Sequence, residues 1–198
     1  SGHFHDIGGD QIFDMAENMS GDNFAAMDSD SAFGMFEAMG ASTAQGLESD
    51  QLGGMFSAME YSNFGDIGGS QVFDLAGSMS GEDFAQMGSE SALGMFESMG
   101  SNVAMDMGGE QLAGMFSAMG HEHMSSMGSD TLVAATDKME FEDFQMMSGD
   151  SAYGMMETMG MDNVLSMEGD QMAGMFSAME SHHISDMGAD RSFEAFQT

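Results

Sequence analysis

Hydrophobic residues follow a helical rhythm along the whole chain. In the segment 49–59 they are Leu52, Met55, Phe56 and Met59, at positions i, i+3, i+4 and i+7. These positions form one face of an amphipathic helix, whereas a half-buried strand would alternate apolar and polar residues. The segment therefore predicts a helix of about ten residues with a single apolar stripe.

Polar residues and glycines mark the expected ends of this helix. Ser49 is expected to be the N-cap, and Asp50 to lie in the first turn, where the helix dipole favours negative charge. Left-handed C-caps are expected at the glycines that directly follow the last Met of a unit, which are Gly40, Gly100, Gly120 and Gly160. The segment 20–27 follows the preceding helix, and its residues Phe24 and Met27 predict a short helix or a single turn.

The same pattern returns at one fixed spacing, without insertion or deletion. Met occupies one column at every unit from Met19 to Met179, and a second column from Ile7 to Met187 holds only Met, Leu or Ile. Because one unit cannot bury its apolar stripe alone, units must stack on one another. The sequence therefore predicts an all-α fold, a short-helix solenoid of ten 20-residue helix–turn–short-helix repeats that form a single array over residues 1–198. At a helix spacing of roughly 8 to 10 Å, the array would be on the order of 80 to 100 Å long.

A longer period, equal to three units, overlies the first. The segment 51–59 returns almost unchanged at 111–119 and 171–179, which defines blocks 1–60, 61–120 and 121–180 and a partial block 181–198. Duplication of a three-unit block would produce this period, and so would a turn of about 120° at each unit. Glycine inside a helix costs roughly 1 kcal/mol relative to alanine. A glycine column inside the predicted helices therefore indicates close backbone approach between neighbours, at Gly34, Gly54, Gly94, Gly114, Gly154 and Gly174.

The charge balance restricts the partners. Two basic residues stand against 34 acidic ones, for a formal charge of −32. Nucleic acids and anionic membranes should be repelled, so we expect cations, basic surfaces, flanking repeats or other copies of the chain as partners. No apolar run approaches the roughly 18 residues of a membrane helix, which argues against membrane insertion. Strong acidity also favours an extracellular or secreted location and suggests that salt or divalent cations stabilise the fold.

The Met columns allow two interpretations. Thioether sulfur is a soft ligand suited to Cu(I), and pairs such as Met35/Met39 and Met115/Met119 lie one helical turn apart. Met also fills irregular gaps in a core and packs well against aromatic rings. An adjacent Phe column consists of Phe36, Phe56, Phe96, Phe116 and Phe176. We favour packing.

A column of acidic residues suggests hard cations, with calcium as the one cofactor that the sequence brings forward. Its members are Asp10, Asp30, Asp50, Glu90, Glu110, Asp130, Asp150, Asp170 and Asp190. Helix N-termini explain the same column without a metal. An EF-hand is excluded for the segment that begins at Asp28, because Met39 stands where the twelfth-position glutamate is needed.

The histidines recur in one class of connection, at the three-unit period. They are His3, His5, His121, His123, His182 and His183. The sequence His121–Glu122–His123 places two imidazoles and a carboxylate near each other, which suits Zn(II), Cu(II) or Ni(II). Solvated loop histidines are the alternative.

No catalytic motif accompanies these columns, because the chain has neither a nucleophile elbow nor a phosphate-binding or dinucleotide-binding loop. We therefore expect a non-enzymatic scaffold, spacer or adhesive segment that self-associates end to end and is stabilised by divalent cations. A metal-binding protein is the second hypothesis, with calcium on the acidic column or copper and zinc on the Met and His clusters. A peptide-binding solenoid for basic partners is the third, although near-identical units argue against it.

Overall fold

The chain is helical throughout the part that can be described. The computed structural model describes residue 4 and residues 7–187, and within these there are helices and connecting turns but no strand. The predicted all-α class is thereby confirmed. The helices are α1 Gly9–Ala16, α2 Gly21–Ala25, α3 Ser29–Met39, α4 Ala41–Ala44, α5 Ser49–Ala58, α6 Tyr61–Ile67, α7 Gly69–Ala76, α8 Gly81–Ala85, α9 Ser89–Met99, α10 Ser101–Ala104, α11 Gly109–Met127, α12 Ser129–Thr136, α13 Phe141–Met146, α14 Gly149–Met159, α15 Met161–Val164, α16 Gly169–Ala178 and α17 Ser181–Asp186.

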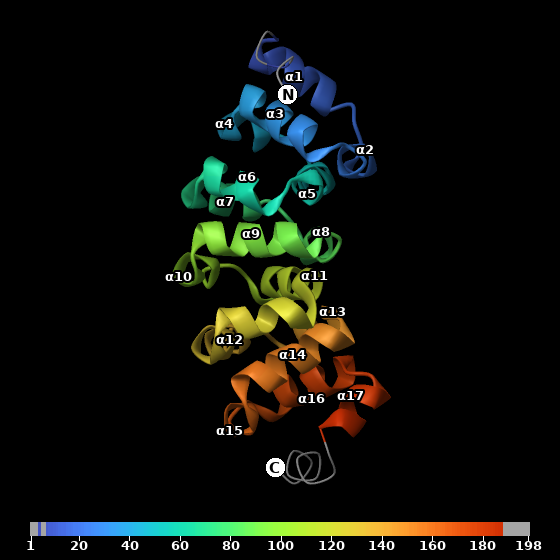
Figure 1. Cartoon of the computed structure of the whole chain (residues 1–198), viewed down its shortest axis with the longest axis vertical. Coiled ribbons are helices and arrows are strands. Elements are labelled where there is room, and N and C mark those ends of the chain that lie inside the picture. The colour runs from blue at the N-terminus through green and yellow to red at the C-terminus, as the bar shows by residue number, and fades with distance from the viewer. Residues whose placement is uncertain (1–3, 5–6, 188–198) are drawn as a thin grey trace.

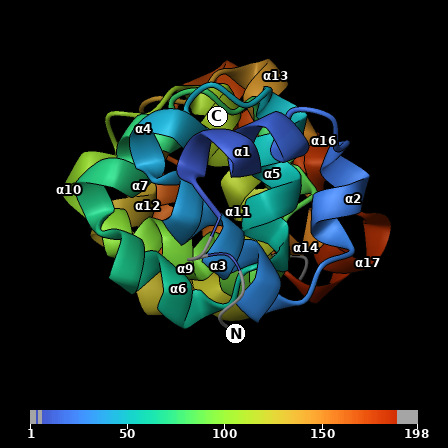
Figure 2. The same cartoon turned by 90° about the horizontal axis from the view of Figure 1, so that it is seen from above.

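The helices are stacked along one long axis, with α1 near one end and α17 near the other (Figure 1). Seen along this axis, α4, α7, α10 and α12 lie on one side of the stack and α2 and α17 on the other (Figure 2). Contacts follow the same order: α5 packs on α2 and α8, and α11 packs on α8 and α14. Helices that follow each other along the chain therefore build up the stack layer by layer.

The helix that contains segment 49–59 has a different N-cap from the one predicted. Its N-cap is Glu48, and Ser49 is the first helical residue, so the expected Ser49 cap is wrong. The backbone N–H of Glu48 donates instead to the side-chain oxygen of Gln51 at 2.9 Å. The Ser49 hydroxyl turns to the next layer, where it contacts the Asp83 carboxylate and accepts the Ser80 N–H at 3.0 Å. Asp50 lies in the first turn, as predicted.

Single glycines join several successive helices directly. Gly40 is both the C-cap of α3 and the N-cap of α4, with φ 75° and ψ 152°. The glycines with positive φ in the described residues are Gly40, Gly68, Gly100, Gly120, Gly128 and Gly160. The predicted left-handed C-caps at Gly40, Gly100, Gly120 and Gly160 are confirmed only in the sign of φ, because their ψ values are extended rather than left-handed helical. This combination is almost exclusive to glycine, and it lets one helix start where the previous one stops.

The glycine column inside the long helices does lie against a neighbouring backbone. A Cβ added to Gly94 would be 2.8 Å from the Tyr61 Cα, and one added to Gly174 would be 2.8 Å from the Phe141 carbonyl oxygen. A Cβ at Gly54 would overlap the Gly21 carbonyl more severely still. Corresponding close approaches occur at Gly114 and Gly154, whereas Gly34 would meet only the Phe4 ring at 3.5 Å. Close approach is therefore confirmed at five of the six positions.

Met and Phe side chains form one continuous core. Buried residues from Ile12 to Met187 belong to a single hydrophobic cluster. Met55, Met95, Met115 and Met155 occupy the same position in different 20-residue units, and all four are 0% exposed. The Phe column belongs to the same cluster, and its Phe36 and Phe56 rings are 6.1 Å apart. The preference for packing over ligation at these columns agrees with this burial. In the described residues, no helix is both long enough and apolar enough to span a bilayer.

Replacing Gly54 with alanine should destabilise the fold. The added methyl group would overlap the Gly21 backbone, and overpacking of this kind typically costs about 1–3 kcal/mol. Gly65→Ala is the matched control, because this helical glycine has no atom within 4 Å of the added Cβ and should gain up to about 1 kcal/mol of helix propensity. Urea unfolding monitored by circular dichroism measures the change in stability of both variants. Equal midpoints for the two variants would contradict the role assigned to the close approach.

Candidate functional site

The acidic column lies at helix N-termini along the stack. Eight of these residues lie in the first turn of a helix: Asp10 in α1, Asp30 in α3, Asp50 in α5, Glu90 in α9, Glu110 in α11, Asp130 in α12, Asp150 in α14 and Asp170 in α16. All eight are exposed, and Asp190 lies outside the described residues. Favourable interaction with the helix dipole is therefore available to each of them without a metal ion.

Two of these carboxylates also bind the start of a second helix. The backbone N–H of Gly21 donates to Asp50 Oδ2 at 3.2 Å, and that of Gly81 donates to Glu110 Oε1 at 3.3 Å. Each acid thus interacts with the N-terminus of its own helix and with that of α2 or α8. Such carboxylates tie layers together, a role that the sequence alone did not reveal.

The candidate ligands His121, Glu122 and His123 do not converge. His121 Nε2 is 3.2 Å from Glu157 on α14, whereas His123 Nε2 is 3.7 Å from Glu90 on α9. The two imidazoles therefore face carboxylates on different helices, so the structure does not assemble this tripeptide as one ligand set. His3 and His5 lie outside the described residues.

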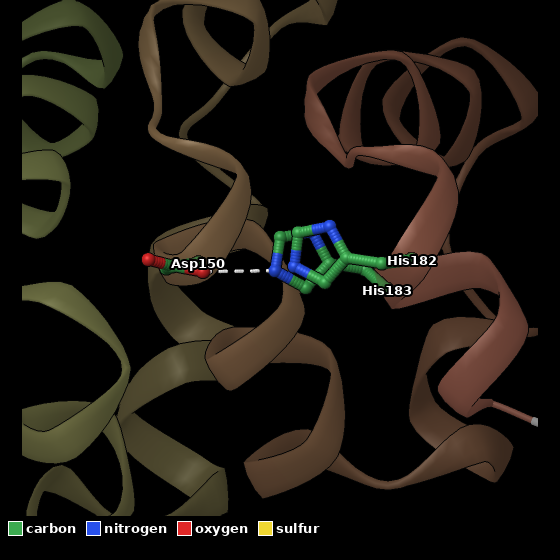
Figure 3. Close-up of side chains that lie close together, drawn as sticks. All are labelled: Asp150, His182 and His183. Carbon is green, nitrogen blue, oxygen red and sulfur yellow. Dashed lines mark hydrogen bonds and ion pairs between the residues drawn. The ribbon is translucent and has the colours of Figure 1, made fainter.

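One group in the described part of the chain brings three potential metal ligands together. It consists of Asp150, His182 and His183, whose ligand atoms all lie within 4.8 Å of one another. Asp150 comes from the first turn of α14, and both histidines come from the start of α17 (Figure 3). Among the acidic column, only Asp150 takes part in such a group within the residues described. Calcium binding by the column stays a prediction.

The chain positions His183 by a local cap and by a nearby glycine. Glu180 is the N-cap of α17, and His183 is the third helical residue, so its ring folds back to accept the Glu180 backbone N–H at Nδ1, 3.1 Å away. A Cβ on Gly149 would lie 3.1 Å from the His183 ring, so the absence of a side chain there makes room for it. The His183 side chain is 5% exposed as a result.

These contacts define the tautomer of His183. Because Nδ1 accepts a hydrogen bond, the ring proton of the neutral imidazole is on Nε2. Nε2–H therefore donates to Asp150 Oδ1, 2.8 Å away. Both ring nitrogens are engaged, although the Asp150 and His182 side chains remain 74% and 59% exposed.

Aromatic and acidic groups extend this cluster toward α11. The Tyr153 ring stacks on His183, with centroids 5.2 Å apart, and meets His121 edge-on at 5.7 Å. The Tyr153 hydroxyl donates to Glu157 Oε1 at 2.9 Å, and Glu157 in turn faces His121. Three histidines, one tyrosine and two carboxylates thus form a continuous polar row over α11, α14 and α17. Sequence reasoning missed Tyr153 and Glu157, although Glu157 recurs at the three-unit period with Glu37 and Glu97.

Glutamine side chains were also missed, although their period is visible in the sequence. Gln51 Nε2 donates to the Met19 carbonyl at 2.6 Å, Gln111 Nε2 to Met79 at 2.8 Å and Gln171 Nε2 to Met139 at 3.0 Å. These carbonyls follow the ends of α1, α7 and α12, where the helices provide no partner of their own. The recurrence of this glutamine at every third unit could have been recognised as a link between layers.

Two ionisable groups elsewhere in the described chain have displaced pKa values. The Ser31 hydroxyl and backbone N–H both donate to the Asp28 carboxylate, which lowers the pKa of Asp28. The hydrogen bond from Tyr61 to the Glu97 carboxylate raises the pKa of the Tyr61 hydroxyl. Both groups are on the exposed surface.

Comparisons of the chain with protein-family models, with curated proteins and with solved structures found no match. Function is therefore inferred from the residues and their geometry.

Replacing His183 should reveal its role as a cap. Asparagine can accept the Glu180 N–H, as Asn63 accepts the Glu60 N–H at 2.8 Å, so His183→Asn should leave the start of α17 intact. His183→Ala removes the acceptor and should cost about 1 kcal/mol. Hydrogen exchange at the Glu180 amide, measured by NMR, should be accelerated in the alanine variant only. Equal exchange rates in the two variants would argue against the cap.

Proposed function

We propose that the protein is a non-enzymatic, strongly acidic scaffold or spacer, built as a helical solenoid of equal short units. The observation that carries this proposal is the single hydrophobic cluster from Ile12 to Met187, which passes through every layer of the stack. A chain whose core is a continuous seam presents one long surface rather than one enclosed pocket. Such a surface suits spacing or adhesion.

The helix bounds support a three-unit block within this solenoid. The 11-residue helices α3, α9 and α14 begin at positions 29, 89 and 149, and the 8-residue helices α1, α7 and α12 begin at 9, 69 and 129. Gln51, Gln111 and Gln171 bind equivalent carbonyls in the layer before them. Blocks 1–60, 61–120 and 121–180 are therefore our proposed units of duplication.

The state of His183 favours a structural role over catalysis. Its Nδ1 already accepts the Glu180 N–H, and its Nε2–H is donated to Asp150. A general base needs a free lone pair within reach of substrate. The His183 imidazole therefore has no free lone pair to offer in this arrangement.

We also propose that the scaffold extends by end-to-end contact with a second copy. Met15 is 45% exposed on α1, near one end of the stack (Figure 1), whereas Leu75 and Ala135, at the equivalent positions of later blocks, are 0% exposed. The positions inside the stack are covered by neighbouring layers, so an end that carries the same apolar pattern is suited to another copy of this chain.

We propose cations and basic surfaces as the partners of the chain and, because of the same charge, a location outside the cell. The chain has a formal charge of −32 and only two basic residues, so its carboxylates repel one another and concentrate counterions around the chain. Diffuse binding of divalent cations such as calcium to the exposed first-turn carboxylates would reduce this repulsion. The acid column thereby supports a stabilising role for calcium rather than a catalytic one.

Thermal unfolding should depend strongly on salt. Screening of the surface carboxylates should raise the unfolding midpoint by several degrees between low salt and about 0.15 M ionic strength, and CaCl2 should act more strongly than NaCl at equal ionic strength. Circular dichroism during heating measures this change, with MgCl2 as the control for specificity. Equal effects of calcium and magnesium indicate diffuse binding. A midpoint that is independent of salt would contradict the proposed role of cations.

Sedimentation velocity over a range of concentrations tests end-to-end association. The wild-type chain should form larger species as concentration rises, and Met15→Glu should suppress them by placing a charge on the apolar end. Val103→Glu is the matched control, because Val103 is also exposed but lies on α10, midway along the stack (Figure 1). A strictly monomeric wild-type chain at high concentration would refute the association, and equal loss in both variants would refute the assignment to the end.

A further inference from the structure

We propose that Asp150, His182 and His183 form a binding site for a late first-row divalent transition-metal ion of the zinc, nickel or copper class. The site goes beyond the scaffold function, because that function requires only diffuse binding of hard cations. It combines one member of the acidic column with two adjacent histidines from a helix that comes later in the chain. Figure 3 shows the Asp150 carboxylate and the two imidazole rings facing one another between α14 and α17.

The geometry is close to that of a coordinated ion. Metal–nitrogen and metal–oxygen bonds of about 2.0 to 2.2 Å place neighbouring ligand atoms roughly 3 to 3.5 Å apart. In the structure, the three ligand atoms lie within 4.8 Å of one another, and His183 Nε2 is 2.8 Å from Asp150 Oδ1. Small rotations of Asp150 and His182, which are both largely exposed, would bring them to bonding distance. His183 is buried and supplies the fixed member of the set.

The donor set selects the class of ion. Calcium and magnesium prefer oxygen ligands, so two imidazoles among three protein ligands disfavour both. Imidazole nitrogen with carboxylate oxygen suits zinc, copper and nickel, and water would complete the coordination sphere. The exposure of Asp150 and His182 leaves a path for the ion and for these waters.

The hydrogen bonds of His183 predict what changes when the ion binds. In the metal-free chain the ring proton is on Nε2, which is the nitrogen that faces Asp150. A metal ion on Nε2 needs that lone pair, so the proton moves to Nδ1 through solvent and the ring remains neutral. The Glu180 N–H then loses its acceptor, and Asp150 changes from hydrogen-bond acceptor to metal ligand. Metal binding is therefore coupled to loss of the capping hydrogen bond of α17.

Isothermal titration calorimetry of the full chain with Zn²⁺ tests the site. The chain is used without an affinity tag, and excess Mg²⁺ is present to occupy the exposed carboxylates. We expect one saturable site per chain. His182→Asn, His183→Asn and Asp150→Asn should each weaken the affinity at least about tenfold, since even loss of an outer-shell partner has an effect of this size.

Matched controls separate this site from other histidines and from damage to the fold. His121→Asn and His123→Asn alter histidines that face Glu157 and Glu90, and a double variant of His3 and His5 to Asn covers the remaining two. All three should retain wild-type affinity. The His183→Asn variant keeps an acceptor for Glu180, so its circular dichroism spectrum should match that of the wild type.

Two further measurements identify the ligands and the coupling. Electron paramagnetic resonance of the Cu²⁺-loaded chain should show nitrogen hyperfine splitting that is lost in the His182→Asn, His183→Asn double variant. Zn²⁺ should accelerate hydrogen exchange at the Glu180 amide. Zinc affinity that is abolished by Mg²⁺, or that is unchanged in the double variant, would overturn the site. Unaltered exchange at Glu180 with saturating Zn²⁺ would overturn the coupling to α17. Neither result bears on end-to-end association, so the scaffold proposal stands or falls separately.

Discussion

Close contact between a glycine-bearing helix face and the backbone of an earlier short helix is the constraint on which the stack depends. At Gly54, Gly94 and Gly174 there is no space for even a methyl group, because α2, α6 and α13 lie directly against the helix. This contact sets the distance between layers, and the distance determines which side chains meet. Met and Phe then fill the remaining irregular space, for which a flexible thioether is well suited. Mid-helix glycine also weakens each helix by itself and makes it depend on its neighbours.

Much of the fold follows from residues that recur within one unit. The apolar stripe of Leu52, Met55, Phe56 and Met59 indicated a helix, and all four residues are buried in it or at its end. Local rules were less reliable at the helix starts. Ser49 has the chemistry of an N-cap, but Gln51 binds the Glu48 amide from inside the helix, and the serine hydroxyl binds the adjacent layer instead. The capping preference of a serine describes one helix, whereas the hydrogen bond that Ser49 makes depends on the adjacent layer.

The histidine cluster illustrates the same limit more sharply. Asp150 stood in the acidic column, and His182 and His183 stood in the histidine-bearing connections. The sequence nevertheless suggested His121–Glu122–His123 as the ligand set, because those residues are adjacent along the chain. In the structure the rings of that tripeptide point to different helices, while His183 reaches Asp150 on a different layer. The pairing of His183 with Asp150 depends on the rise and the rotation between successive units. The sequence of one unit alone does not determine these two quantities. Equivalent offsets pair His123 with Glu90, and Asn63 lies in the corresponding place near Ser29, so one geometric position carries different chemistry in each block.

The one-residue junctions at Gly40, Gly100 and Gly160 have a consequence for how such a protein can change over evolutionary time. No loop is present at these junctions to absorb an extra residue, since the same glycine ends one helix and starts the next. One inserted amino acid would turn the following helix by about 100° and move its apolar stripe toward water. Lineages of this chain should therefore lengthen or shorten by whole modules, and point substitution within a fixed frame should be the main source of new chemistry.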